Sequence, residues 1–195
     1  MTKNEALKKQ FDPVFTAIND LLAKQEYVTV AIDGPSGAGK SLLGQLIKGS
    51  YDCNIFHMDD FFLQDHQRTI QRLEEVGGNI DYERFTKEVI EKIKGQEDFS
   101  YRVFDCKTGD FSHSVRVSPK KLNIIEGVYS SHPLWYDILD LKVFLSIDKE
   151  KQVQRILSRN GPQMLERFKR EWIPLEDKFF TALSTAKKFD IVIDS

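Results

Sequence analysis

Residues 34–41 have the composition and spacing of a loop that binds a chain of phosphates: Gly-Pro-Ser-Gly-Ala-Gly-Lys-Ser. In such a loop, glycines let successive backbone N–H groups approach an anion, and the following helix directs its positive end at the same point. Lys40 is then placed to reach the β- and γ-phosphates, and the Ser41 hydroxyl to bind Mg²⁺. A glycine-rich hairpin or helix cap is the alternative, but the strand-like run before the loop and the helical run after it favour nucleotide binding. The predicted nucleotide contacts are Gly34, Ser36, Gly37, Ala38, Gly39, Lys40, Ser41 and Leu42.

Carboxylates follow two further apolar runs. Asp59 and Asp60 come after residues 54–58, and Glu126 comes after residues 122–125. Ligands of open α/β sheets collect at the carboxyl ends of parallel strands, so these acids should face the phosphates. A carboxylate there can orient an acceptor hydroxyl and take its proton, the role we predict for Asp59, and Glu126 can hold Mg²⁺. Solvated acids that cap the next element are the alternative.

Arg155 and Arg159 are spaced i, i+4 on a predicted helix, so they share one face. Paired guanidinium groups can clamp phosphoryl oxygens as charge shifts during transfer. We predict this catalytic role for both, with an ordinary solvated helix face as the alternative.

The composition is that of an ordinary globular protein, with 195 residues, 41% hydrophobic and 30% charged. A net charge of −2 gives no general attraction to nucleic acid or to anionic membranes. No apolar run approaches the length of a membrane span, and the charged first ten residues are unlike a signal peptide, so we expect a cytoplasmic protein. Two cysteines, Cys53 and Cys106, make neither a disulfide framework nor a zinc cluster.

The elements that must position these residues form a doubly wound α/β pattern over residues 1–195, which we take as one domain. We predict a central parallel sheet of five strands with helices on both faces. A leading helix lies within 1–26, a β-hairpin insertion at 99–118, and lid and C-terminal helices at 149–187. The hairpin strands are expected at 101–105 and 114–117. The predicted sheet strands are 27–33, 54–58, 122–125, 141–147 and 189–194.

Taken together, the motifs resemble the uridine kinase-like branch of the phosphoribulokinase/uridine kinase family of P-loop kinases. The phosphate loop alone occurs in many families, whereas the ordered set is more specific and runs from Val28 to Arg159. The matching segments are GPSGAGKS, HMDDFF, GGNIDYERF, YRVFDCKTGD, NIIEGVYSSH and KVFLSIDKEKQVQRILSR.

The resemblance implies particular roles. Asp59 matches the acid proposed as catalytic base, which also lies close to the metal, and Glu126 matches the acid associated with Mg²⁺. Arg155 and Arg159 fall in the lid helix whose arginines contact phosphates. Asp81 matches an acid that holds sugar hydroxyls of the acceptor, although it is also well placed to cap a helix. The implied acceptor contacts are Asp81, Phe62, Phe104, Tyr82 and Arg84.

One departure concerns the acceptor. Phe104 stands where uridine-cytidine kinases usually have a tyrosine that reads the pyrimidine, and no histidine follows before His113. Such polar groups give a pocket its discrimination, so the sequence leaves the acceptor undefined.

We therefore predict an enzyme that uses ATP and Mg²⁺ to phosphorylate a hydroxyl of a small molecule, foremost the 5′-hydroxyl of a nucleoside. One alternative is a nucleoside monophosphate kinase of the cytidylate type, whose phosphate loop is similar to IDGPSGAGK. The other is a non-catalytic, regulatory protein that binds ATP. No nucleic-acid or membrane partner is expected, and homo-oligomerisation is left open.

Overall fold

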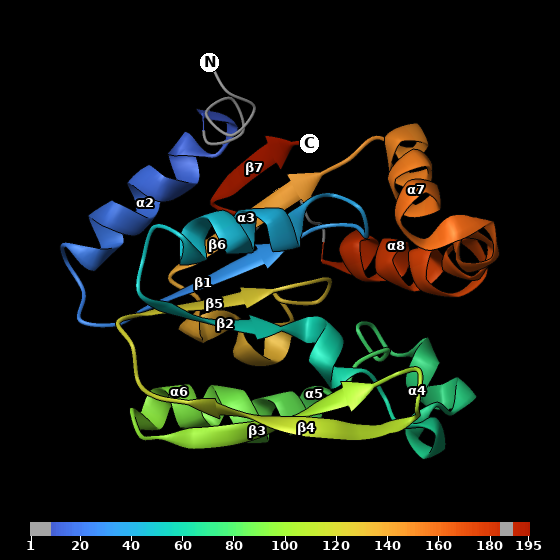
Figure 1. The fold of residues 1–195 in the computed structure, drawn as a ribbon, viewed down its shortest axis with the longest axis horizontal. Helices are drawn as coiled ribbons and strands as arrows, with labels where there is room; N and C mark the ends of the chain where they lie inside the picture. The colour runs from blue at the N-terminus through green and yellow to red at the C-terminus, as the bar shows by residue number, and fades with distance from the viewer. Residues whose placement is uncertain (1–8, 184–188) are drawn as a thin grey trace.

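Five parallel strands form the central sheet of the protein (Figure 1). The structure is a computed structural model that describes residues 9–183 and 189–195. The spatial order of the strands is β2-β5-β1-β6-β7, and every pairing is parallel, which confirms the predicted sheet. The strands are β1 (Val28–Asp33), β2 (Cys53–His57), β5 (Leu122–Glu126), β6 (Leu141–Ser146) and β7 (Ile191–Asp194).

Helices cover both faces of this sheet, as its apolar strands require. Side chains of β1 enter two different apolar clusters: Val30 and Ile32 on one face, Ala31 on the other. The first face is covered by α2 and α3, and the second by α8 and by the helical stretch that α5 begins (Figure 1). The helices are α2 (Asp12–Leu22), α3 (Lys40–Lys48), α4 (Ile70–Glu74), α5 (Tyr82–Phe85), α6 (Glu91–Gly95), α7 (Lys149–Arg167) and α8 (Ile173–Ala182).

Several short helical turns join these elements. Pro13 lies in the first turn of α2, where a missing N–H costs nothing; of the predicted leading helix, residues 1–8 lie outside the described residues. The 3₁₀ segments are Met58–Phe61, Asp65–Gln67 and Pro133–Ile138, and the π-helical segments are Thr86–Ile90 and Phe168–Trp172.

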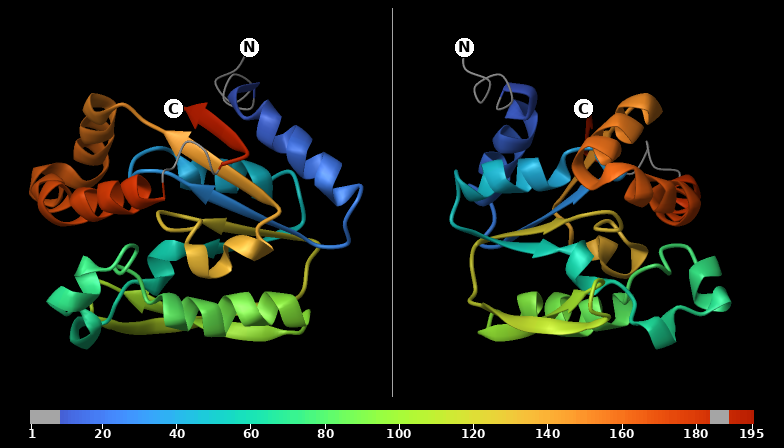
Figure 2. Two further views of the ribbon diagram at one scale, coloured as in Figure 1. Left: turned by 180° about the vertical axis from the view of Figure 1, so that it is seen from behind. Right: turned by 45° about the vertical axis from the view of Figure 1, so that its right-hand side comes forward.

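A separate antiparallel hairpin lies beyond the second face of the sheet. Its strands are β3 (Phe99–Asp105) and β4 (Asp110–Val117). β4 is longer than predicted because pairing continues to the turn at residues 106–109, and β3 begins two residues earlier than predicted because Phe99 and Ser100 pair with the end of β4. Tyr101 and Val117 belong to the apolar cluster that also contains the inner side chains of β1 and β2. Figure 2 shows the hairpin with α5 and α6 as a layer of its own below the central sheet.

Residues 149–182 form a bent helical arm. Gly161 interrupts α7 with a φ of 79°, and Pro162, which cannot donate a helical N–H, follows it. The π-helical segment Phe168–Trp172 then leads into α8, whose first turn contains Pro174. Residues 184–187 of the predicted lid region lie outside the described residues. Among the described helices, none is long and apolar enough to cross a membrane.

Candidate functional site

The phosphate loop follows β1 directly and leads into α3. Gly34 has a φ of 140°, and a Cβ there would lie 2.2 Å from the carbonyl oxygen of Leu145, so only glycine fits against β6. Gly39 is left-handed, with a φ of 97°, and forms the N-cap of α3. Lys40, at the first residue of α3, donates from Nζ to the carbonyl oxygens of Gly34 and Pro35, at 2.7 and 3.0 Å. Gly34, Gly37 and Gly39 all have positive φ angles, so the loop has the glycine-dependent turns that an anion nest requires.

Asp33 supports this loop from beneath. Its carboxylate is fully buried and accepts hydrogen bonds from the backbone N–H groups of Gly34, Tyr129 and Ser131. Burial raises the pKa of Asp33 to about 6, against the lowering effect of these bonds. Asp33 thus ties the end of β1 to the segment after β5. We did not predict this role from the sequence, where the only signal is an acid at the end of an apolar run.

Ser41 and Glu126 lie together at the carboxyl ends of the strands. The Ser41 hydroxyl is 3.1 Å from Oε1 and 3.3 Å from Oε2 of Glu126. His57, at the end of β2, contacts the same carboxylate, with Nδ1 2.6 Å from Oε1. The hydrogen bond to Glu126 raises the pKa of His57. The hydroxyl and carboxylate oxygens form a donor set that suits Mg²⁺.

A hydroxyl and one carboxylate are not a complete metal site. Among residues 9–183 and 189–195, no three His, Cys, Asp or Glu side chains come close enough to share a metal ion. Mg²⁺ in phosphoryl-transfer sites takes one or two protein ligands, and its other ligands are phosphate oxygens and waters. The residues present therefore fit Mg²⁺ bound together with a nucleotide.

Asp59 lies at the end of β2, in the 3₁₀ turn Met58–Phe61. Burial raises the pKa of its carboxyl group, the nearby charges of Lys40 and Arg159 lower it, and that of Glu126 raises it. The same edge of the sheet thus brings Asp59, Lys40 and Glu126 together, as the sequence predicts from their places after the strands.

Two cavities, each of about 300 Å³, meet at this edge. We call the first the loop cavity; its walls are Ser36, Gly37, Gly39, Lys40, Ser41, Leu42, Asp59, Glu126, Gly127, Val128, Arg155 and Arg159. We call the second the aromatic cavity; its walls are Ser36, Met58, Asp59, Phe62, Asn79, Ile80, Val128, Tyr129, Arg159, Asn160, Met164, Phe168, Trp172 and Glu176. Four residues line both cavities: Ser36, Asp59, Val128 and Arg159.

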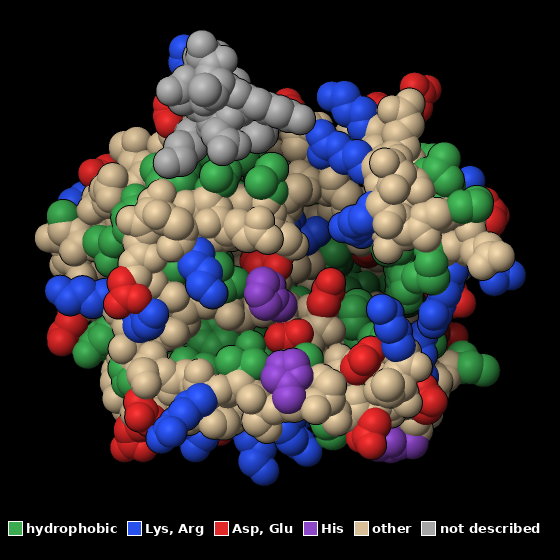
Figure 3. Space-filling model, in the orientation of Figure 1, with side chains coloured by type: hydrophobic (Ala, Val, Ile, Leu, Met, Phe, Trp, Pro, Cys, Tyr) green, Lys and Arg blue, Asp and Glu red, His purple; other side chains and the backbone are tan. Residues whose placement is uncertain are grey.

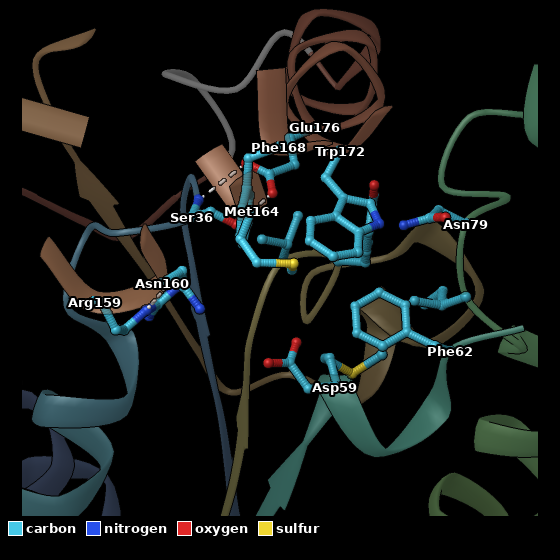
Figure 4. Close-up of a pocket in the computed structure, with 14 residues that line it drawn as sticks. Ser36, Asp59, Phe62, Asn79, Arg159, Asn160, Met164, Phe168, Trp172 and Glu176 are labelled. Atoms are coloured by element: carbon cyan, nitrogen blue, oxygen red, sulfur yellow. Dashed lines mark hydrogen bonds between the residues drawn. The ribbon is translucent and has the colours of Figure 1, made fainter. Parts of the chain in front are cut away.

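The surface view and a close-up show the surroundings of the aromatic cavity. Figure 3 shows a hollow beside the helical arm with hydrophobic side chains at its base and charged side chains around it. Figure 4 shows Asp59 on one side of the aromatic cavity and Glu176 on the opposite side, with the rings of Phe62 and Trp172 along the wall between them. Those two rings are stacked, with centroids 6.4 Å apart.

Six of the eight predicted nucleotide contacts line the loop cavity. The other two, Gly34 and Ala38, are not among its walls, because Gly34 faces β6 and Ala38 is buried in the core. The two arginines differ. Arg159 lines both cavities, whereas Arg155 lines only the loop cavity and donates to the carbonyl oxygen of Gly37 at 3.0 Å.

Of the five predicted acceptor contacts, only Phe62 lines the aromatic cavity. Asp81 accepts hydrogen bonds from the backbone N–H of Arg84 and from Nε2 of Gln67, so it caps α5. Its side chain is therefore engaged in holding the local structure, in line with the capping alternative.

The other three predicted contacts also lie outside both cavities. Arg84 is buried, donates to the carbonyl oxygens of Arg102 and Asp60, and forms ion pairs with Asp81 and Glu88, so its guanidinium is engaged within the local structure. The Tyr82 hydroxyl donates to Glu75. Phe104 is buried against Phe111 in the hairpin.

The helical arm supplies walls of the aromatic cavity that the sequence did not predict. Phe168 and Trp172 form part of the aromatic wall, with ring centroids 4.5 Å apart. Glu176 is a charged residue of α8, yet it is buried, with 3% of its surface exposed. It is buried because Ser36 satisfies its carboxylate, a contact across 140 positions of sequence that helix periodicity cannot reveal.

Comparison with known proteins first defines the class. No family model matches the chain. A protein from Bacillus stearothermophilus described as a possible uridine kinase has a similar structure, with a TM-score of 0.70, 24% identity, and coverage of 97% of this chain and 100% of that one. A protein from Silicibacter sp. TM1040 described as a candidate fructose transport system kinase has a TM-score of 0.68 at 20% identity, with coverage of 92% and 97%. The fold is that of the P-loop kinases.

The nearer resemblance comes from a curated sequence. The chain is 29% identical over 164 residues to uridine-cytidine kinase C of Dictyostelium discoideum, a match that covers 80% of this chain and 36% of that protein. The chain thus spans little more than a third of the length of this relative. The similarity confirms the resemblance to the uridine kinase-like branch that the ordered motifs indicate.

Proposed function

We propose that the protein is an ATP-dependent kinase that transfers the γ-phosphoryl group to a hydroxyl of a small molecule, the 5′-hydroxyl of a nucleoside such as uridine or cytidine. The observation that carries this proposal is the meeting of the two cavities at Asp59 and Arg159. A phosphate-binding site and an apolar pocket that share a carboxylate and a guanidinium have the arrangement that phosphoryl transfer requires.

The loop cavity would take the nucleotide. Backbone N–H groups of the loop and Lys40 would bind the phosphates, which requires Nζ of Lys40 to leave the carbonyl oxygens of Gly34 and Pro35. Ser41 and Glu126 would hold Mg²⁺, which when bound neutralises charge on the phosphate oxygens.

The aromatic cavity would take the acceptor. Its rings suit a flat apolar group, and Asp59 at its inner end would orient the hydroxyl toward the loop cavity. Burial raises the pKa of Asp59, which brings it nearer to the pH at which a general base works best. The hydroxyl proton would pass to Asp59 as the new bond to phosphorus forms.

Arg159 would contact the transferred group, since it is the guanidinium that reaches both cavities. Arg155, bound to the carbonyl oxygen of Gly37, would hold the phosphate loop against α7. The helical arm would therefore hold the phosphate loop at the carbonyl group of Gly37.

The test is a screen for ADP release that depends on an acceptor. The purified protein with ATP and Mg²⁺ is given uridine, cytidine, fructose, pantothenate or a sugar phosphate, and products are identified by mass spectrometry. We expect ADP release with uridine or cytidine and a nucleoside 5′-phosphate as product. Binding of ATP without ADP release on any acceptor would instead identify a protein that only holds the nucleotide.

A further inference from the structure

Ser36 is held at three points by the helical arm. Its backbone N–H donates to Oε2 of Glu176 at 2.9 Å, and its hydroxyl donates to Oε1 of the same side chain at 2.5 Å. Its carbonyl oxygen accepts from Nε2 of Gln152 at 3.0 Å. One residue at the meeting point of the two cavities is thus fixed by α7 and α8 together.

These bonds decide what Ser36 can offer to a ligand. Because its only hydroxyl proton is directed to Glu176, the oxygen has lone pairs left and no hydrogen to donate. Burial raises the pKa of Glu176, whereas the two hydrogen bonds from Ser36 and the charge of Lys40 lower it. The corner formed by Ser36 and Glu176 therefore offers hydrogen-bond acceptors, and it carries a negative charge whenever Glu176 is ionised (Figure 4).

The walls of the aromatic cavity contain more acidic than basic side chains. Two carboxylates, Asp59 and Glu176, line it, and Arg159 is the one cation among its walls within the described residues. Arg159 is shared with the loop cavity, where Lys40 and Arg155 lie. A bound nucleotide triphosphate would draw Arg159 toward its own oxygens, which leaves the acceptor side with the two carboxylates.

We propose that Glu176 is a specificity-determining residue that admits uncharged hydroxyl acceptors and rejects acceptors that already carry a phosphate. This inference rests on the proposed function and adds to it the charge of the acceptor. A phosphate at the reacting end of an acceptor would place its oxygens between Asp59 and the corner formed by Ser36 and Glu176. Like charges at such distances repel, and Ser36 has no proton with which to compensate.

A purely structural role for Glu176 makes a different prediction. If the carboxylate only anchors the phosphate loop, its replacement alters the binding of uridine and of UMP in the same proportion. If it sets the charge preference, the ratio between the two changes. The measurement that separates these roles is therefore a ratio and not an absolute rate.

The variant to test is Glu176→Gln, which has nearly the same shape, still accepts the Ser36 N–H, and has no charge. Asp177→Asn is the matched control, because it removes the same charge from the next residue of α8, where Asp177 is exposed and paired with Lys149. For each protein, kcat/KM is measured with uridine and with UMP at saturating ATP and Mg²⁺. Dissociation constants of both probes are measured by tryptophan fluorescence, since Trp172 lies in the cavity wall.

We expect the uridine-to-UMP ratio, in kcat/KM and in affinity, to fall by about tenfold or more in Glu176→Gln and to stay within about twofold in Asp177→Asn. An unchanged ratio in Glu176→Gln, or binding of neither probe by any of the proteins, overturns the inference. The affinity ratio also separates the two proposals: a shift in binding without turnover of either probe would support the role of Glu176 and refute the kinase activity.

Discussion

The loop cavity and the aromatic cavity are built in opposite ways. Half of the walls of the first, six of twelve, come from the single stretch 36–42, whose shape depends on glycine. The second is assembled from five separate segments, to which Ser36, Phe62, Asn79, Tyr129 and Trp172 belong, and most of its walls are side chains from distant parts of the sequence. A site made by backbone serves many proteins alike, whereas a site made by distant side chains can differ from one to the next. In the proposed function, the nucleotide side is therefore the general part of the site, and the acceptor side is the individual part.

The largest expected effects come from variants that remove one charge from each cavity, and they test the division of roles directly. Lys40→Ala removes the cation that reaches the phosphates, and we expect loss of activity by more than about 10³-fold together with much weaker ATP binding. Asp59→Asn keeps the shape of the shared wall but has no base, so we expect loss of activity with ATP affinity within about threefold of the wild type. Activity is measured by ADP release, and ATP affinity by calorimetry. Equal loss of ATP affinity in both variants would contradict the division of roles.

A second pair compares the two arginines of the helical arm. Arg159→Ala removes the guanidinium that lines both cavities, and we expect kcat to fall by about 10²-fold. Arg155→Ala loses a bond to the carbonyl oxygen of Gly37, and we expect kcat to fall only several-fold, with a comparable rise in the KM for ATP. Steady-state kinetics with ATP and with uridine as the varied substrate measure kcat and both KM values. A larger effect on kcat from Arg155→Ala would place the transferred group farther from the aromatic cavity.

The third pair compares an aromatic residue of the arm with one of the hairpin. Trp172→Ala removes a ring that stacks on Phe62, and we expect the KM for uridine to rise by about tenfold while the KM for ATP is unchanged. Phe104→Ala removes a ring that packs on Phe111 outside both cavities. We expect it to lower the free energy of unfolding by about 3 kcal/mol and to leave the KM for uridine within about twofold. A raised KM for uridine in Phe104→Ala, with an unchanged KM in Trp172→Ala, would place the acceptor site at the hairpin instead.

The same contrast explains what the sequence could reveal. The five strands, the loop and the acids at strand ends follow from local patterns, because apolar runs, glycines and the edge of a parallel sheet restrict where such residues lie. The acceptor contacts implied by the resemblance fix a position along the chain but not the direction of a side chain. Arg84 is turned toward two carbonyl oxygens. Glu176 is the opposite case. A charged residue in a helical pattern indicates a solvent-exposed position, and only the contact with the distant Ser36 explains why Glu176 is buried.

The smallest effect concerns two buried groups, Asp33 at the end of β1 and His132 in the segment after β5. Burial raises the pKa of Asp33, under the phosphate loop, from 3.8 to about 6. Burial, with the charge of Arg72, lowers the pKa of His132 from 6.5 to about 4; this ring stacks on Tyr82 and Trp135. A raised carboxyl pKa favours folding below pH 3.8 and loses that contribution as the pH rises through 6. A lowered imidazole pKa favours folding above pH 6.5 and loses that contribution as the pH falls through 4.

The two contributions oppose each other between pH 4 and pH 6, and each has a slope of up to about 1.4 kcal/mol per pH unit. We therefore expect the free energy of unfolding from these two groups to be nearly independent of pH in the wild type. In His132→Phe, which keeps an aromatic ring, only the Asp33 slope remains, so stability should fall as the pH rises from 4 to 6. Urea denaturation at pH 4, 5, 6 and 7 measures this, with the wild type as reference. Parallel curves for the two proteins would show that folding does not lower the pKa of His132, which would mean that the nearby charge of Glu83 offsets the burial of the ring beside Trp135.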